Sequence, residues 1–164
     1  MNPPLLLSTL SLQNPALITS NLTSLLKSCT HSTHIQQLQS KILTLGLGRS
    51  SSLLTTAALS YLSLGLLRPA LRLFLSMPAP SSFLSNTIIR SFANDGQFTR
   101  SLDLYSALLG SHLRPDRFTF PFALKSCAGL SNLALGKQVH GHIVHFGWAR
   151  DLHVNASLVD MYAK

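Results

Sequence analysis

Three histidines near the C-terminal end of the sequence are the residues whose type and spacing best suit metal binding or proton transfer. His142 and His145 are three residues apart, so they can share one face of a helix, and His140 lies close by. A zinc site would also need cysteine or carboxylate ligands, and none is placed near these histidines. We therefore expect no metal site and no cofactor.

The other residue types that catalysis requires are scarce. The chain has five aspartates, the first of them Asp95, and no glutamate. It has no paired carboxylates for acid–base chemistry, no glycine-rich phosphate loop and no nucleophile motif. These absences predict a protein that is not an enzyme.

The two cysteines mark a repeat. Cys29 and Cys127 are 98 residues apart, and each closes the sequence Leu-Lys-Ser-Cys. The register continues with five identical pairs that are 101 residues apart: Gln37 and Gln138, Ile42 and Ile143, Gly46 and Gly147, Arg49 and Arg150, and Tyr61 and Tyr162. A three-residue deletion in a turn explains the two intervals. We interpret the thiols as small buried groups at helix contacts.

Residues 82–116 form the clearest repeating unit. A helix through residues 86–92 is ended by Gly96, since glycine readily adopts the left-handed conformation that follows a helix. The second helix carries apolar residues at steps of three and four, which predicts one buried stripe. The stripe consists of Phe98, Leu102, Tyr105, Leu108 and Leu109. Pro115 then closes the unit, because proline does not continue a helix.

Residues 117–151 repeat this plan over the same length. We predict that Gly129 ends the first helix and that Ser131 and Asn132 cap the second. Gly136 and Gly141 lie inside the second helix, where each costs about 1 kcal/mol relative to alanine. We expect both glycines to allow a close approach between helices.

The remaining sequence divides in the same manner. Residues 51–81 form a shorter unit, with Gly65 ending its first helix. Residues 19–50 form a degenerate long unit, and residues 152–164 form a truncated one, so we expect a fragment of a longer array. Residues 1–18 lie outside the repeats and are interpreted as an organelle transit segment.

The charge balance favours a polyanionic partner. Thirteen lysines and arginines face five aspartates, which gives a net charge of +8, and the six basic residues from Lys27 to Arg90 have no acidic neighbour in that stretch. Neutralising phosphates releases condensed counterions, so such a surface favours nucleic acid. An import sequence is the alternative explanation for the acid-poor residues 1–25.

Residues 50–67 are uncharged, but they do not resemble a membrane span. Seven of these 18 residues are serine or threonine, and this polarity disfavours a lipid environment. We expect no membrane partner and no small-molecule substrate.

Motifs within the units resemble those of the plant pentatricopeptide repeat proteins, in the subclass that mixes long, short and standard units. The similar segments are NTIIRSF (86–92), SLDLY (101–105) and LRPD (113–116) for a standard unit, FTFPFALKSC (118–127) and LGKQVHGH (135–142) for a long unit, and LVDMYAK (158–164) for the start of a short unit. The resemblance covers residues 19–164. It implies an all-α fold, a right-handed superhelical solenoid of helical hairpins.

The same resemblance implies a function. Such proteins bind single-stranded RNA in mitochondria or chloroplasts, with one base read by each unit, and this subclass mostly specifies sites of cytidine-to-uridine editing. The editing deaminase needs a His-x-Glu pattern, which a chain without glutamate cannot supply. A deaminase-bearing or editing-factor protein acting in trans is therefore an expected partner. The mitochondrion is the expected location, with the chloroplast as the alternative.

By similarity, the fifth and last residues of a unit select the base. In the standard unit these are Asn86 and Asp116, which resemble the combination associated with uridine. The second residues, Phe83 and Phe118, would sandwich that base, and such stacking contributes about 1–3 kcal/mol. Two simpler interpretations stay open: Asn86 as a helix N-cap, and the phenylalanines as packing between neighbouring units.

The other units give weaker expectations. Thr55 and Ser81 are the RNA-binding pair of the short unit, but the usual partner of threonine is asparagine, so a preference for adenine is in doubt. Pro121 and Ala156 hold the fifth positions of the next two units and offer no side-chain donor.

A tetratricopeptide-like scaffold that binds proteins or peptides is the alternative function. Such arrays share the paired helices and the concave groove. Their units are 34 residues long, whereas units of 31 and 35 residues occur here. Unit length and the acid-poor surface favour RNA.

Overall fold

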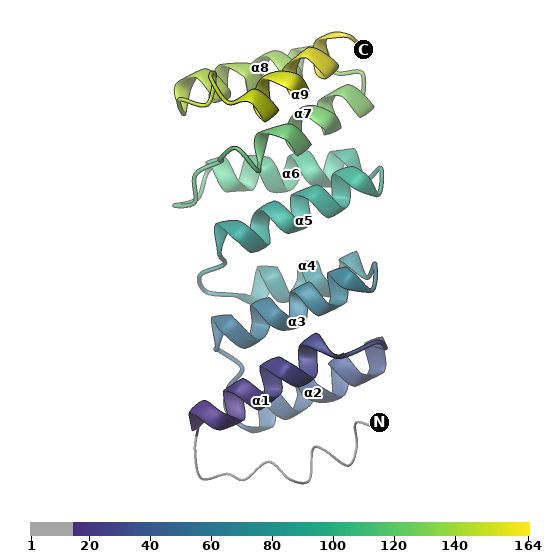
Figure 1. The fold of residues 1–164 in the computed structure, drawn as a ribbon, viewed down its shortest axis with the longest axis vertical. Coiled ribbons are helices and arrows are strands. Elements are labelled where there is room, and N and C mark those ends of the chain that lie inside the picture. The colour runs from purple at the N-terminus through teal and green to yellow at the C-terminus, as the bar shows by residue number, and fades with distance from the viewer. Residues whose placement is uncertain (1–14) are drawn as a thin grey trace. The chain divides into compact units, whose positions relative to one another are not determined.

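The computed structural model describes residues 15–164, in which all regular secondary structure is α-helical (Figure 1). The helices are α1 (Pro15–Lys27), α2 (Ser32–Thr44), α3 (Ser51–Ser63), α4 (Leu67–Ser76), α5 (Ser82–Asn94), α6 (Phe98–Leu109), α7 (Phe120–Gly129), α8 (Leu133–His145) and α9 (Leu152–Tyr162). The all-α prediction is confirmed for these 150 residues, which contain nine helices and no strand. The chain divides into two compact units, Met1–Pro80 and Ser81–Lys164.

The first unit contains two helical hairpins. Short turns connect α1 to α2 and α3 to α4, so the helices of each pair run antiparallel, and α1 also packs against α3. Buried Ser60 of α3 donates a hydrogen bond from its hydroxyl to the main-chain oxygen of Leu26 in α1, at 2.8 Å. The fully buried apolar side chains include Leu22, Leu26, Ile35, Ile42 and Leu53.

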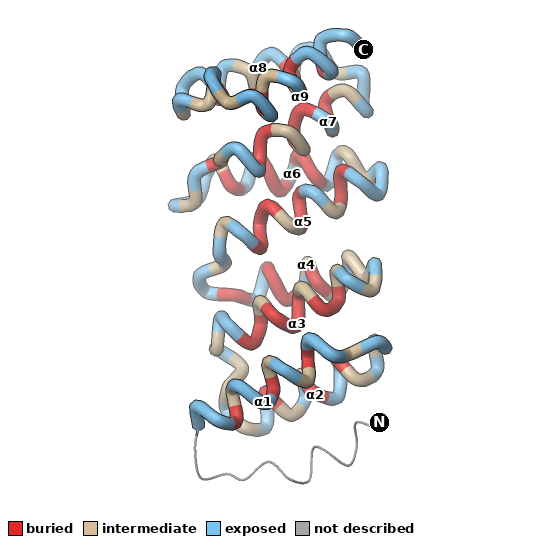
Figure 2. Tube along the Cα trace, viewed as in Figure 1, coloured by how far each residue is buried: buried red, intermediate tan, exposed pale blue. Residues whose placement is uncertain are grey.

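The second unit repeats this plan with the hairpins α5–α6 and α7–α8, followed by α9. Helix α5 packs on α7, and α7 packs on α9, so the first helices of successive hairpins are neighbours (Figure 1). The hydroxyl of Ser101 in α6 donates to the main-chain oxygen of Ile89 in α5 at 3.2 Å. Buried residues lie along α5, α6 and α7 (Figure 2). The largest fully buried side chains include Leu84, Ile88, Ile89, Phe92, Phe120 and Leu124.

The internal repeat has a counterpart in hydrogen bonding. In the first unit the Tyr61 hydroxyl donates to Oε1 of Gln39 at 3.2 Å. In the second unit the Tyr162 hydroxyl lies 3.0 Å from Nδ1 of His140. Tyr162 follows Tyr61 by 101 residues, and His140 follows Gln39 by 101 residues. This is the interval that separates the identical pairs in the sequence. Each bond joins the second helix of a hairpin to the helix that follows it, α2 to α3 and α8 to α9.

Left-handed residues follow several helices. Four glycines have φ between 72° and 81°: Gly46, Gly65, Gly96 and Gly147. Gly129 is the last residue of α7, so the helix ends where it was predicted to end, but Ser131 holds the left-handed position, with φ of 51°. Gly129 has a packing role, since a Cβ atom there would overlap the ring of Phe98.

The two glycines inside α8 have different surroundings. A Cβ atom on Gly136 would overlap Sδ and Cε of Met161, so this glycine lets α8 approach α9, as predicted. Gly141 is exposed, and a Cβ atom there would meet no atom within 4 Å. The expected close approach at Gly141 is therefore wrong.

The buried stripe of α6 follows the predicted spacing in its centre. Leu102, Tyr105 and Leu108 are buried, while Phe98 and Leu109 at the two ends are partly exposed. Leu104 is buried as well, because α6 packs against both α5 and α7.

Most of the predicted transit segment, residues 1–18, lies outside the described residues. Pro15 begins α1, so this helix crosses the predicted boundary between residues 18 and 19. The division into repeat units stays a prediction. Among residues 15–164, no helix has the length and apolar character that crossing a membrane requires.

Candidate nucleic-acid interface

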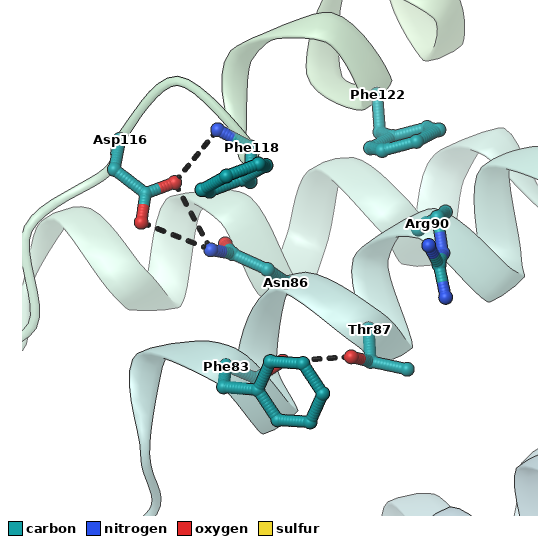
Figure 3. Close-up of a pocket in the computed structure, with 7 residues that line it drawn as sticks. All are labelled: Phe83, Asn86, Thr87, Arg90, Asp116, Phe118 and Phe122. Carbon is teal, nitrogen blue, oxygen red and sulfur yellow. Dashed lines mark hydrogen bonds between the residues drawn. The ribbon is translucent and has the colours of Figure 1, made fainter.

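A pocket of about 400 Å³ lies between α5 and the segment that leads into α7 (Figure 3). Its lining consists of Phe83, Asn86, Thr87, Arg90, Asp116, Phe118 and Phe122. This volume is in the range of pockets that hold small organic molecules. Four of the six predicted RNA-binding residues therefore line one pocket, and Thr55 and Ser81 are not part of its lining.

The start of α5 places Asn86 at this pocket. Ser81 is the N-cap of the helix, and its Oγ accepts a hydrogen bond from the main-chain N–H of Leu84 at 3.3 Å. Asn86 is the fifth residue of α5 and is 9% exposed. The N-cap interpretation of Asn86 is therefore wrong. Its amide bonds to side chains from the segment before α7.

Asp116 caps the turn that leads into α7. Its Oδ1 accepts hydrogen bonds from the main-chain N–H of Phe118 at 2.8 Å and of Thr119 at 3.1 Å. The same carboxylate accepts from Nδ2 of Asn86, at 3.0 Å to Oδ1 and 3.2 Å to Oδ2 (Figure 3). The fifth and last residues of the predicted standard unit are thus in direct contact across 30 residues of sequence.

Thr119 completes this polar cluster and was not among the predicted site residues. It is fully buried, and its Oγ1 donates to Oδ1 of Asn86 at 2.6 Å. The main-chain N–H of Asp116 donates back to the same Oγ1 at 3.0 Å. Asp116 and Thr119 therefore form a reciprocal capping box. The Asp-x-x-Thr spacing is visible in the sequence and marks this turn, but it does not reveal the bond to Asn86.

Phe83 and Phe118 present largely exposed rings to the pocket. Their side chains are 64% and 59% exposed, respectively, although both are large apolar groups. This exposure does not fit the simpler interpretation that the two rings serve only to pack neighbouring units together. The guanidinium of Arg117 lies 5.0 Å from the centre of the Phe118 ring, which is within the range of a cation–π contact.

The other predicted coding residues have surroundings of a different kind. Thr55 is the fifth residue of α3 and is partly exposed. Ser81 and Asp151 are the last residues of their predicted units, and they are the N-caps of α5 and α9. Oδ1 of Asp151 accepts from the main-chain N–H of His153 at 2.9 Å. These last positions, like Asp116, therefore have a structural role in starting the next helix.

The histidines of α8 bond to aromatic residues. Nδ1 of His142 lies 2.9 Å from the hydroxyl of Tyr105, and His140 pairs with Tyr162. The ring of His145 lies edge-on to that of Phe146, with 5.1 Å between their centres. Within residues 15–164, no three histidine, cysteine or acidic side chains are grouped so that they could hold a metal ion.

Positive charge at the pocket is contributed by Arg90, which is exposed. All five aspartates lie in residues 81–164, so residues 1–80 carry basic groups without acidic ones.

Burial raises the pKa of Tyr105, and it raises the pKa of Cys127 to about 11. Both groups are therefore neutral near pH 7. Cys127 is buried as expected, whereas Cys29 is partly exposed.

Several proteins of Arabidopsis thaliana are similar to this chain. No family model matches the sequence. One pentatricopeptide repeat-containing protein of Arabidopsis thaliana is 36% identical over 141 residues, which is 86% of this chain and 20% of that protein. A second is 35% identical over 150 residues, covering 86% of this chain and 22% of that protein. A third, named as chloroplastic, is 34% identical over 111 residues, covering 68% of this chain and 14% of that protein.

The chain thus spans about a fifth of the length of the first two relatives. The similarity extends over most of its own residues, including the hairpins that form the pocket. The homologues of this chain are plant pentatricopeptide repeat-containing proteins, and this homology supports its membership of the pentatricopeptide repeat family.

Proposed function

We propose that this chain binds single-stranded RNA and forms an RNA-recognition part of a longer protein that acts in organelle RNA processing. The observation that carries the proposal is the pocket in which an amide and a carboxylate lie beside two largely exposed phenyl rings from successive hairpins. The homology to plant pentatricopeptide repeat-containing proteins and the net charge of +8 also support it.

The proposed ligand of the pocket is one unstacked base, held between Phe83 and Phe118. The Asn86 amide has two N–H donors and two acceptor lone pairs. Asp116 engages one donor and Thr119 engages one lone pair, which leaves one donor and one acceptor. Uracil offers the complementary set, a ring N–H flanked by carbonyl oxygens. Adenine and cytosine also offer a donor beside an acceptor, so the choice among bases rests on the resemblance of the Asn86 and Asp116 pair to the combination associated with uridine. Uridine is the proposed base at this unit, and Thr55 and Ser81 are proposed as weaker contacts at the unit before it.

The proposed role of the longer protein is to recognise sites of cytidine-to-uridine editing. This chain contributes binding and no catalysis, since it contains no glutamate to serve the deaminase. A deaminase-bearing or editing-factor protein acting in trans is a proposed partner. The proposed location is the mitochondrion, with the chloroplast as the alternative.

Binding of labelled oligouridine and oligoadenosine to the whole chain tests the proposal. We expect tighter binding of oligouridine, and binding that weakens steeply as salt concentration rises. Phe83→Ala and Phe118→Ala are each expected to weaken binding by about 1–3 kcal/mol. Leu133→Ala is the matched control, because Leu133 is also a large apolar side chain, is 49% exposed and lies outside the pocket.

Asn86→Ser tests base selection at the same site. It is expected to shift the preference away from uridine at one position while the helical content is unchanged. An unchanged base profile would remove the coding role of Asn86. Failure of the wild-type chain to bind any uridine-containing RNA would overturn the proposal, and a peptide library would then test the tetratricopeptide-like alternative.

A further inference from the structure

Thr119 is fully buried and hydrogen-bonded to the residue proposed to read the base. Its hydroxyl has one proton and two acceptors within reach, Oδ1 of Asn86 at 2.6 Å and Oδ1 of Asp116 at 3.1 Å. The shorter distance assigns the proton to Asn86. The hydroxyl oxygen meanwhile accepts from the main-chain N–H of Asp116. Thr119 is therefore held in place by the turn that it caps, and it acts on Asn86 from a fixed position.

Two different partners hold the two ends of the Asn86 amide. Asp116 accepts from the nitrogen end, and Thr119 donates to the oxygen end. If the amide rotated by half a turn, its oxygen would face the Asp116 carboxylate, and two acceptors would oppose each other. The observed orientation is therefore specified by the surrounding groups, and the same N–H and lone pair remain for a ligand.

We propose that Thr119 is a positioning residue for base selection, which holds the Asn86 amide in the orientation that reads uridine. The inference rests on the proposed RNA binding at this pocket. Thr119 belongs to the predicted unit that follows the one containing Asn86, so base selection by one unit depends on the first turn of the next. A side chain ordered before binding loses less conformational entropy when the base arrives. The Asn86 amide also presents its free N–H and its free lone pair to the base in a fixed order.

Thr119→Val removes the hydroxyl and keeps the shape of the side chain, whereas Thr119→Ser keeps the hydroxyl. The probe is a set of oligoadenosines that carry a single uridine or a single cytidine, measured in competition. We expect wild type and Thr119→Ser to prefer uridine equally. In Thr119→Val the ratio of affinities for the uridine and cytidine probes should be about three- to tenfold smaller. The affinity of this variant for plain oligoadenosine should stay the same.

A double-variant cycle separates positioning from a general structural effect. In an Asn86→Ser background, Thr119→Val should cause no further loss of discrimination, because the amide on which it acts is gone. A loss of equal size in that background would overturn the proposal, as would full discrimination by a folded Thr119→Val protein. A wild-type chain that binds RNA without any base preference, or binds none, would overturn the proposed function and this inference together.

A second measurement uses the wild-type protein alone. It is needed because valine at position 119 leaves Oδ1 of Asn86 without its hydrogen-bond donor, which can destabilise the folded chain. Nitrogen-15 relaxation of the Asn86 side-chain amide in the free wild-type protein should show it to be as rigid as the backbone of α5. An amide that reorients freely in the folded chain would overturn the proposal.

Discussion

Ser131 holds the same backbone position after α7 that Gly147 holds after α8. The main-chain N–H of Ser131 donates to the oxygen of Ala128 at 3.0 Å, and that of Gly147 donates to the oxygen of Val144 at 3.1 Å. Their φ angles are 51° and 81°. Glycine adopts this left-handed conformation freely, whereas another residue there costs about 1–3 kcal/mol. The turn after α7 thus contains a strained residue.

Ser131→Gly is expected to stabilise the protein by about 1 kcal/mol. The change removes the left-handed strain, and the greater freedom of glycine in the unfolded chain offsets about 0.4–1 kcal/mol of that gain. Urea unfolding followed by circular dichroism measures the effect. Gly147→Ser is the matched reverse change and should destabilise the protein by a similar amount. Equal stability of wild type and Ser131→Gly would show that the turn is not strained.

Arg90→Gln is expected to weaken RNA binding and to reduce its dependence on salt. Arg90 lines the pocket and is exposed, so its guanidinium can reach a phosphate of the bound strand. Losing one phosphate contact on single-stranded RNA should reduce the slope of log K against log salt by about 0.7. Arg100→Gln is the control, because Arg100 lies on α6 and bonds to Gln97. If both changes alter the slope equally, Arg90 contacts the phosphates of the bound strand no more than Arg100 does.

The helices of this fold could be predicted because their signals are local. Gly65 and Gly96 mark helix ends through their own backbone preference. Asn132 caps α8 as its sequence position indicates, and its Oδ1 accepts from the main-chain N–H of Leu135 at 3.0 Å. Gly129 ends α7 as predicted, but the left-handed residue is Ser131. Glycine has two uses, a left-handed turn and a close approach, and the sequence alone does not distinguish them.

The contacts within the pocket could be predicted only in part. Repeat position singles out Asn86 and Asp116, but the hydrogen bond from Thr119 joins residues 33 apart in the sequence. Such a contact depends on how α5 packs against α7. Sequence periodicity identifies the buried face of each helix, but it does not give the register between two helices.

Cys127 is expected to make the stability of the protein depend on pH in the alkaline range. Burial raises the pKa of its thiol to about 11 from an ordinary value of 9.0. The folded state therefore keeps the thiol proton at pH values where the unfolded chain loses it. The resulting stabilisation is fully present below pH 9 and is lost as pH rises through 11.

Comparing wild type with Cys127→Ala isolates this effect from other groups that titrate at high pH. Between pH 8 and pH 10, the unfolding free energy of wild type should fall by about 1 kcal/mol more than that of Cys127→Ala. Cys29→Ala is the comparison at the partly exposed cysteine, whose pKa burial also raises. Parallel pH profiles for wild type and Cys127→Ala would mean that the thiol titrates alike in both states.

Gly136→Ala and Gly141→Ala are expected to change stability in opposite directions, although both replace a glycine inside α8. Alanine is favoured over glycine in a helix by about 1 kcal/mol. Gly141 is exposed with open space around it, so Gly141→Ala should gain this amount. At Gly136 the added methyl would overlap Met161, and overpacking of this kind costs about 1–3 kcal/mol. Combining Gly136→Ala with Met161→Ala should relieve the overlap. Thermal unfolding of wild type, Gly136→Ala, Met161→Ala and the double variant measures the coupling. Stabilisation by Gly136→Ala alone would mean that the end of the Met161 side chain moves aside at little cost.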